Sequence, residues 1–148
     1  MNINRLVICA GATLVLCGCG GSQSYVKNGE IQRTIDQEAF QKKYIEAIGI
    51  GAADAKMTNT TQRRATSRDA AIVQSQYEML SVIKGLRLEG GMVVEKAMET
   101  DSKLTTNIND VIKAAEIVKT EWTNDDGCLV TLRLDKAHFE KMTGTKFE

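Results

Sequence analysis

The chain has 148 residues, and its 19 basic and 19 acidic side chains give a formal net charge of zero at pH 7. This balance disfavours nucleic acid as a partner, and the length is that of one small domain. With only one histidine, His138, and four cysteines, a zinc site or a Cys-His catalytic pair is also disfavoured.

Residues 1–18 have the layout of a bacterial secretory signal. One basic residue, Arg5, precedes an apolar run over residues 6–16. This run is too short to span a membrane, because a transmembrane helix needs about 20 apolar residues. We therefore expect export and removal of this segment. The 19 basic residues then fall to 18 with the loss of Arg5, against 19 acidic ones.

The signal ends in the motif Leu-Cys-Gly-Cys at residues 16–19. This motif resembles a lipobox, in which leucine stands three positions before a cysteine and small residues lie between them. The resemblance implies cleavage between Gly18 and Cys19, diacylglycerol on the Cys19 thiol, and a fatty acid such as palmitate on the new amino group. Two or three acyl chains, at about 0.8 kcal/mol per buried methylene, make a stable membrane anchor. The alternative is an ordinary signal peptide.

Residues 19–43 are predicted to be a lipid-anchored tether and lead-in. Gly20 stands where aspartate would be the common signal for retention in the inner membrane, which favours the outer membrane with the domain facing the periplasm. Glycine and serine over residues 20–24 predict a flexible linker. The apolar and charged residues over 29–43 favour a short amphipathic helix over a partly ordered segment.

Only one thiol is expected in the mature protein. Two cysteines leave with the signal and Cys19 carries lipid, so Cys128 has no partner for an intramolecular disulfide. Cys128 alternates with other apolar residues, which predicts a small buried hydrophobic side chain rather than a nucleophile.

Residues 44–142 are predicted to form the folded domain, beginning with a strand over residues 44–52. One face of this strand carries only small residues, Ala47, Gly49 and Gly51, which suits the close approach of a helix or a neighbouring backbone. A nucleotide-binding loop is disfavoured, because the third glycine and the Lys-Ser/Thr pair of such loops are missing.

A long amphipathic helix is predicted over residues 60–84. Asn59 is its expected N-cap, Gln62 completes a capping box, and Gly85 ends it. The expected apolar side comprises Ala65, Ile72, Val73, Met79, Leu80, Val82 and Ile83. The expected outer side comprises Arg63, Ser67, Gln74 and Ser81.

The stretch after this helix is predicted to be extended. Apolar and charged residues alternate over residues 86–99, which indicates a strand, with a bulge or bend at Gly90 and Gly91. Residues 101–110 are predicted to be a polar connection with at most a helical turn.

A hairpin and a short helix are predicted to close the domain. The strands are expected over residues 114–122 and 128–134, joined by a turn over 124–127 whose Asp-Gly pair tolerates positive φ. Asp135 is expected to cap a helix through about Met142. Residues 143–148 are left as a C-terminal tail.

No metal, cofactor or catalytic set is predicted. Asp125 and Asp126 are adjacent but lack the spaced ligands of a calcium loop, so turn chemistry is their expected role. We see no Ser-His-Asp constellation. A periplasmic enzyme is therefore the least favoured of the functions considered.

Several motifs together suggest a family. They are the strand over residues 44–53, the small and basic helix residues Arg64, Ala65, Ala70, Ala71 and Leu80, the segment 83–88, and the hairpin pattern of 114–118, Trp122 and 127–134. This pattern over residues 44–136 resembles the membrane-associated lipoprotein-20 family, which includes flagellar outer-membrane lipoproteins. The resemblance implies a small non-enzymatic envelope protein, and some members take part in flagellar basal structures or motility. Only Cys19 transfers as a functional position. The short proline-free lead-in departs from the flagellar subgroup.

The expected fold is α+β, with one long helix on a three- to four-stranded, mainly antiparallel sheet. The expected order is strand-helix-strand-strand-strand, with short flanking helices. The expected function is structural or in assembly, at the outer membrane and with a possible link to the flagellum. The alternative is a periplasmic lipoprotein that binds a small ligand or peptide on the sheet face left free by the helix.

The predicted partners are the membrane, through the lipid, and either further copies of the chain or other envelope and flagellar proteins. One helix covers one face of such a sheet, and lipid anchoring concentrates copies in a plane, so a homo-oligomer is expected. The alternative is a monomer whose segment 29–43 folds back over the open face.

Overall fold

The computed structural model of the protein describes residues 24–31 and 43–147. The predicted signal, the lipobox and Cys19 therefore lie outside the described residues, as does most of the helix predicted over 29–43. Within the described part, Val26–Lys27 (β1) and Glu30–Ile31 (β2) form a short antiparallel hairpin. The helix prediction is wrong for its first residues, because Asn28 and Gly29 both have positive φ (54° and 79°) and form a tight turn.

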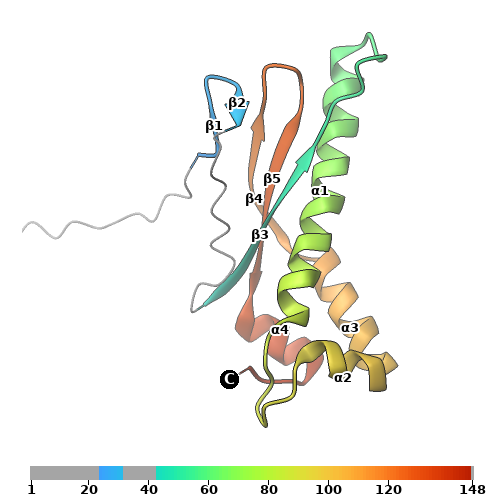
Figure 1. Ribbon diagram of the computed structural model, residues 1–148, viewed down its shortest axis with the longest axis vertical. Coiled ribbons are helices and arrows are strands. Elements are labelled where there is room, and N and C mark those ends of the chain that lie inside the picture. Colours follow the sequence, from blue (N-terminus) through green and yellow to red (C-terminus); the bar gives the residue numbers. More distant parts are fainter. Residues whose placement is uncertain (1–23, 32–42, 148) are drawn as a thin grey trace, which may run out of the picture.

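The domain has two layers, a three-stranded antiparallel sheet and a long helix packed along one of its faces (Figure 1). The strands are β3 (Tyr44–Gly51), β4 (Glu116–Trp122) and β5 (Cys128–Asp135), and β5 lies between the other two. The helix is α1 (Thr60–Lys84). The predicted α+β fold with a helix on an antiparallel sheet is confirmed.

The predicted ends of α1 are confirmed. The side chain of Asn59 accepts hydrogen bonds from the backbone N–H groups of Thr61 and Gln62, at 2.9 and 3.2 Å, so it caps the helix. The helix ends at Gly85, with Lys84 in its last turn. Its 25 residues make it roughly 37 Å long, enough to run the length of the sheet.

The predicted inner side of α1 is only partly correct. The residues that are buried follow a spacing of four: Ser67, Ala71, Ser75, Met79 and Ile83. Ser67 was expected on the outer side and is fully buried, whereas Ala65 and Val73 are exposed. The reason is the glycine-containing face of β3, which admits only small residues over the first half of the helix.

Gly49 and Gly51 face α1 at very short distances. A Cβ atom on Gly51 would lie 1.9 Å from the carbonyl oxygen of Ser67, and one on Gly49 would lie 2.3 Å from the backbone nitrogen of Ser75. Real Cβ atoms essentially never come this close to backbone atoms. The predicted close approach of a helix to the small-residue face of this strand is therefore confirmed.

The strand predicted over residues 86–99 is wrong. Gly90 and Gly91 both have positive φ and turn the chain, and Val94–Thr100 forms a helix, α2. Val94 and Ala97 are its buried residues, a spacing of three that belongs to a helix. The sheet has three strands, within the predicted three to four, and no strand of the sheet follows α1 directly.

The predicted polar connection over residues 101–110 is also wrong, because Ser102–Lys113 forms a helix, α3. The side chain of Asp101 caps it by accepting hydrogen bonds from the N–H groups of Lys103 and Leu104. The buried residues of α3 are Leu104, Ile108, Val111 and Ile112. They follow helical spacing and complete the core beside the C-terminal half of α1.

The closing hairpin and helix are confirmed. The chain turns between β4 and β5 with Asp126 at φ 66°, and the Thr123 N–H donates to the Gly127 carbonyl at 2.9 Å. Lys136–Thr143 forms α4, capped by the side chain of Asp135. The fold continues past the helix, since the Phe147 ring stacks on the ring of Phe139 with centroids 5.0 Å apart.

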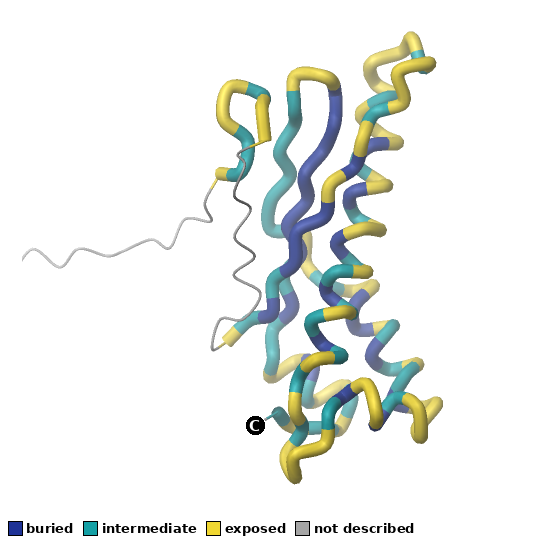
Figure 2. Tube along the Cα trace, in the orientation of Figure 1, coloured by how far each residue is buried: buried dark blue, intermediate teal, exposed yellow. Residues whose placement is uncertain are grey.

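The core lies between the sheet and the helices, and β5 is buried along almost its whole length (Figure 2). Cys128 is fully buried there, which confirms the packing predicted for it. The opposite sheet face is less open than expected: Ile48, Leu129 and Thr131 are 7, 2 and 6% exposed, although Ile50 is 45% exposed.

Candidate functional site

The predicted lipidation residue, Cys19, and the cleavage position, Gly18, lie outside the described residues. The nearest described residue is Ser24, five positions after Cys19. Because an extended chain spans at most about 3.6 Å per residue, the Cα atom of Cys19 lies within about 18 Å of that of Ser24. The position of Ser24 on the domain therefore limits where a lipid anchor can be.

Ser24 and the two residues after it bind the carboxylate of Glu121 on β4. The Ser24 hydroxyl donates to Oε1 at 2.5 Å, and the backbone N–H groups of Tyr25 and Val26 donate to Oε2 and Oε1 at 3.1 and 3.4 Å. The Glu121 side chain is only 12% exposed, and Lys119 Nζ lies 3.6 Å from Oε2. A mostly buried carboxylate with three hydrogen-bond donors and one cation around it is a specific attachment point for residues 24–26.

The pKa of Glu121 reflects this environment. Burial raises the pKa, but the hydrogen bonds from Ser24, Tyr25 and Val26 and the charge of Lys119 together outweigh it, so the pKa lies below its ordinary value. The ionised carboxylate is thus the form that holds the segment.

A second contact attaches the turn between β1 and β2 to the turn between β4 and β5. The Asn124 N–H donates to the Gly29 carbonyl, and the Asn124 side-chain amide donates to the Asn28 carbonyl, both at 2.9 Å. A Cβ atom on Gly29 would lie 1.9 Å from Asn124 Oδ1. The positive φ favours glycine at this position, and a larger residue would also displace the Asn124 side chain from its hydrogen bond to Asn28.

These contacts place residues 24–31 on the sheet face opposite α1 (Figure 1). Glu121 is paired with Leu129, and Leu129 with Ile50, so the three side chains lie on one face. The alternate residues, among them Gly49 and Gly51, face α1. We call residues 24–31, with Glu121 and Asn124, the N-terminal clamp.

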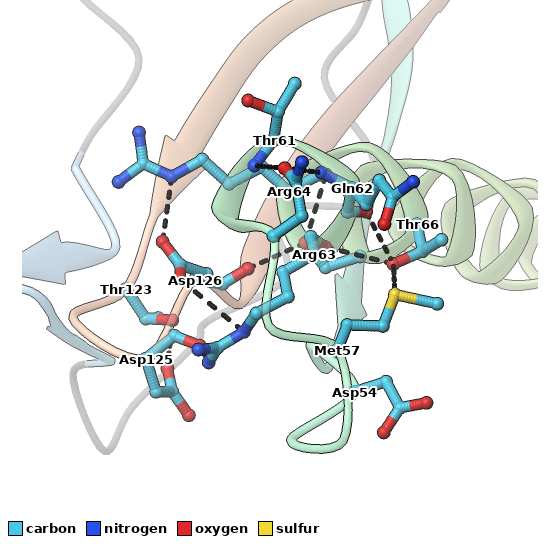
Figure 3. A network of polar contacts seen from close by, with 12 residues as sticks. Asp54, Met57, Thr61, Gln62, Arg63, Arg64, Thr66, Thr123, Asp125 and Asp126 are labelled. Carbon is cyan, nitrogen blue, oxygen red and sulfur yellow. Dashed lines mark hydrogen bonds and ion pairs between the residues drawn. The ribbon is translucent and has the colours of Figure 1, made fainter.

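Another polar network joins the start of α1 to the β4–β5 turn (Figure 3). Asp126 forms ion pairs with Arg64 Nε at 2.8 Å and Arg63 Nε at 3.6 Å, and Ser67 Oγ donates to its backbone carbonyl at 2.7 Å. Arg63 also donates to the Asp125 carbonyl at 2.8 Å. Since its carboxylate is occupied by two guanidinium groups, Asp126 has a structural role, as its turn position predicts.

The remaining candidate residues show no catalytic arrangement. Burial raises the pKa of the Cys128 thiol, an effect that the charge of Arg68 only partly offsets, and this disfavours the reactive thiolate. His138 is exposed on α4. Among residues 24–31 and 43–147, no three His, Cys, Asp or Glu side chains are grouped so that they could hold a metal ion. In the same ranges, no helix is long and apolar enough to cross a membrane.

A groove lies on the other side of the molecule, between α1 and α3, with a volume of about 260 Å³. Its lining is Val73, Gln76, Tyr77 and Leu80 from α1 and Asn109, Ile112 and Lys113 from α3. Val73 and Tyr77, one turn apart on α1, are 49 and 66% exposed, so they add an apolar strip beside the groove. Nothing in the sequence indicated this groove, because residues 101–110, nearly all of which belong to α3, were predicted to be a polar connection.

Comparisons of the chain with family models, with curated proteins and with solved structures find no match. The resemblance to the lipoprotein-20 family therefore remains a prediction that depends on the motifs themselves.

Proposed function

We propose that the protein is a non-enzymatic lipoprotein of the bacterial outer membrane that acts in the structure or assembly of the cell envelope. The observation that carries the proposal is the motif Leu-Cys-Gly-Cys at residues 16–19, placed directly after a charged start and a short apolar run. The lipid on Cys19 anchors the chain, and the α+β domain lies on the periplasmic side.

The arrangement of the domain fits an anchored protein. Ser24, the described residue nearest to Cys19, lies on the face opposite α1, which supports an anchor on the side of the molecule away from the exposed side of α1. The side of α1 that carries Val73 and Tyr77 is thereby left free for contacts with other envelope proteins. The lipoprotein-20 resemblance makes flagellar structures the first place to look for them.

We also propose that anchored copies of the chain associate, although not through the open sheet face that the sequence predicted. On the sheet face opposite α1, Ile48, Leu129 and Thr131 are buried, so this face is not the open apolar surface that was predicted. Ile50 is the exception on that face, at 45% exposed, while α1 carries two exposed apolar side chains one turn apart, Val73 and Tyr77, at 49 and 66%. We therefore propose α1 as the first surface to test for contacts between anchored copies.

The second candidate function is the binding of a small ligand or peptide. The groove between α1 and α3 favours it, because apolar side chains there are joined by the amides of Gln76 and Asn109 and the ammonium group of Lys113. Its volume of about 260 Å³ falls below the roughly 300–1,000 Å³ of typical ligand pockets, so this function ranks second.

The test of the anchor is the Cys19→Ala variant, expressed in a bacterium that processes lipoproteins and labelled with palmitate. We expect an uncleaved precursor without label, because the acylated thiol and the cleavage site are lost together. The matched control is Cys17→Ala, which keeps a small residue two positions before Cys19 and should still be labelled and cleaved. A labelled and cleaved Cys19→Ala protein would rule out the lipobox.

A further inference from the structure

The N-terminal clamp shortens the tether between a lipid on Cys19 and the folded domain. If residues 24–31 were unattached, the linker from Cys19 to Lys43 would have about 24 residues and a root-mean-square length of roughly 27 Å. With Ser24 bound to Glu121, about five residues remain, with a root-mean-square length of roughly 12 Å. The longer linker allows the domain any orientation, whereas the shorter one keeps Ser24, and with it the sheet side of the domain, close to the membrane.

Resting on the proposed function, we infer that the N-terminal clamp orients the anchored domain, with the sheet face around Glu121 nearest to the lipid bilayer and the outer side of α1 farthest from it. The partner of the sheet side is then the membrane surface itself. The groove between α1 and α3 is turned toward the periplasm, where it can meet other proteins.

Two independent attachments make the orientation specific. Glu121 binds Ser24, Tyr25 and Val26, the residues nearest to the lipid. Asn124 holds the turn at Gly29, a few residues further along the chain. A segment fixed at two points cannot swivel about either of them, so the place on the sheet side from which the chain leaves the domain, at Ser24, is fixed.

Glycine substitutions provide a matched pair of variants. Gly29→Ala strains the backbone at a φ of 79° and displaces the Asn124 side chain, whose amide holds Asn28, so we expect it to release the turn. Gly144→Ala introduces a similar strain at a φ of 70°, with no atom within 4 Å, at the end of α4, which lies at the opposite end of the domain from β1 and β2 (Figure 1). Glu121→Ala is an independent variant that removes the other attachment and keeps Gly29.

The experiment measures energy transfer from a fluorophore on the domain to rhodamine headgroup lipids in vesicles of phosphatidylethanolamine and phosphatidylglycerol. The full-length, lipidated protein is labelled at Ile50→Cys on the sheet side or at Val73→Cys on the outer side of α1. These positions have similar exposures of 45 and 49%, and the native Cys128 is buried. Only protein that floats with the vesicles is measured, and circular dichroism checks that each variant is folded.

We expect at least twofold more transfer from position 50 than from position 73. This difference should persist in Gly144→Ala and disappear in Gly29→Ala and in Glu121→Ala. Hydrogen exchange of peptides covering residues 24–31 should show protection lost in the last two variants only. Equal transfer from both positions in floating protein, or a difference that survives both clamp variants, would overturn the orientation alone. Failure of the unmodified protein to float would overturn the lipid anchor and the orientation with it.

Discussion

Gly49 of β3 lies so close to Ala71 of α1 that a Cβ atom on the glycine would be 2.1 Å from the carbonyl oxygen of the alanine. The backbone of the helix therefore rests directly on the strand. This contact sets the distance between the two layers over the first half of α1, and the buried residues of the helix there, Ser67, Ala71 and Ser75, are all small.

Gly49→Ala should destabilise the domain. The added methyl group can be accommodated only by moving α1 away from the sheet, and such overpacking costs about 1–3 kcal/mol. Urea unfolding followed by circular dichroism measures the loss. Gly85→Ala is the control, because its nearest neighbour would be a carbonyl oxygen at 3.5 Å, an ordinary contact. Equal midpoints for Gly49→Ala and the wild type would contradict the close packing.

The ends of α1 could be predicted from the sequence, since its caps are local. Asn59 and Gly85 act on backbone groups within a few residues, so neither depends on the tertiary fold. The turn before β5 was predictable for the same reason. The inner side of α1 could not be predicted, because hydrophobic periodicity gives no weight to serine. Ser67 and Ser75 are buried because only small side chains fit between the helix and the glycines of β3.

The segment after α1 was predicted to be a strand but contains α2, because its sequence fits two patterns. Residues 86–99 alternate apolar and charged side chains, yet Val94 and Ala97 also have the spacing of a helix. The glycines at 90 and 91 decide between the patterns by turning the chain. The clamp hairpin carried a clear signal, since Asn28-Gly29 is a favoured pair for a tight hairpin turn. Within the clamp, Val26 and Glu121 are 95 positions apart in the sequence, so no local pattern reveals their contact.

Asp126→Ala should destabilise the domain by about 1–3 kcal/mol, because it removes a carboxylate shared by two guanidinium groups and leaves Arg63 without its ion-pair partner. Asp126→Asn keeps a residue that tolerates positive φ and separates the loss of charge from the loss of turn geometry. Thermal unfolding of the two variants gives the comparison. Wild-type stability in Asp126→Ala would show that the network does not hold the hairpin to α1.

The clamp should loosen at acidic pH. The pKa of Glu121 in the folded protein lies below its ordinary value of 4.5, so its stabilising contribution is fully present above about 4.5 and is lost as the pH falls through the folded value. Hydrogen exchange at Tyr25 and Val26, corrected for the intrinsic pH dependence, should show this loss. In Glu121→Gln the protection should be lower and independent of pH in this range. Unchanged protection in the wild type well below pH 4.5 would contradict the role of the carboxylate.

Cys128 should react slowly with a maleimide in the folded protein and rapidly in urea, because it is fully buried and burial raises the pKa of its thiol. Cys128→Ser places a hydroxyl in the core and should cost about 1–3 kcal/mol. Cys128→Ala is the comparison, since it introduces no polar group. Rapid labelling under native conditions would contradict the packing.

The most direct test of the proposed lipoprotein is the intact mass of the mature chain, extracted from membranes in detergent, together with fragmentation of its N-terminal peptide. We predict a chain that begins at Cys19 and carries diacylglycerol on the thiol and a fatty acid on the amino group. A mature chain that begins at another residue, or one with a free thiol at Cys19, would contradict the account.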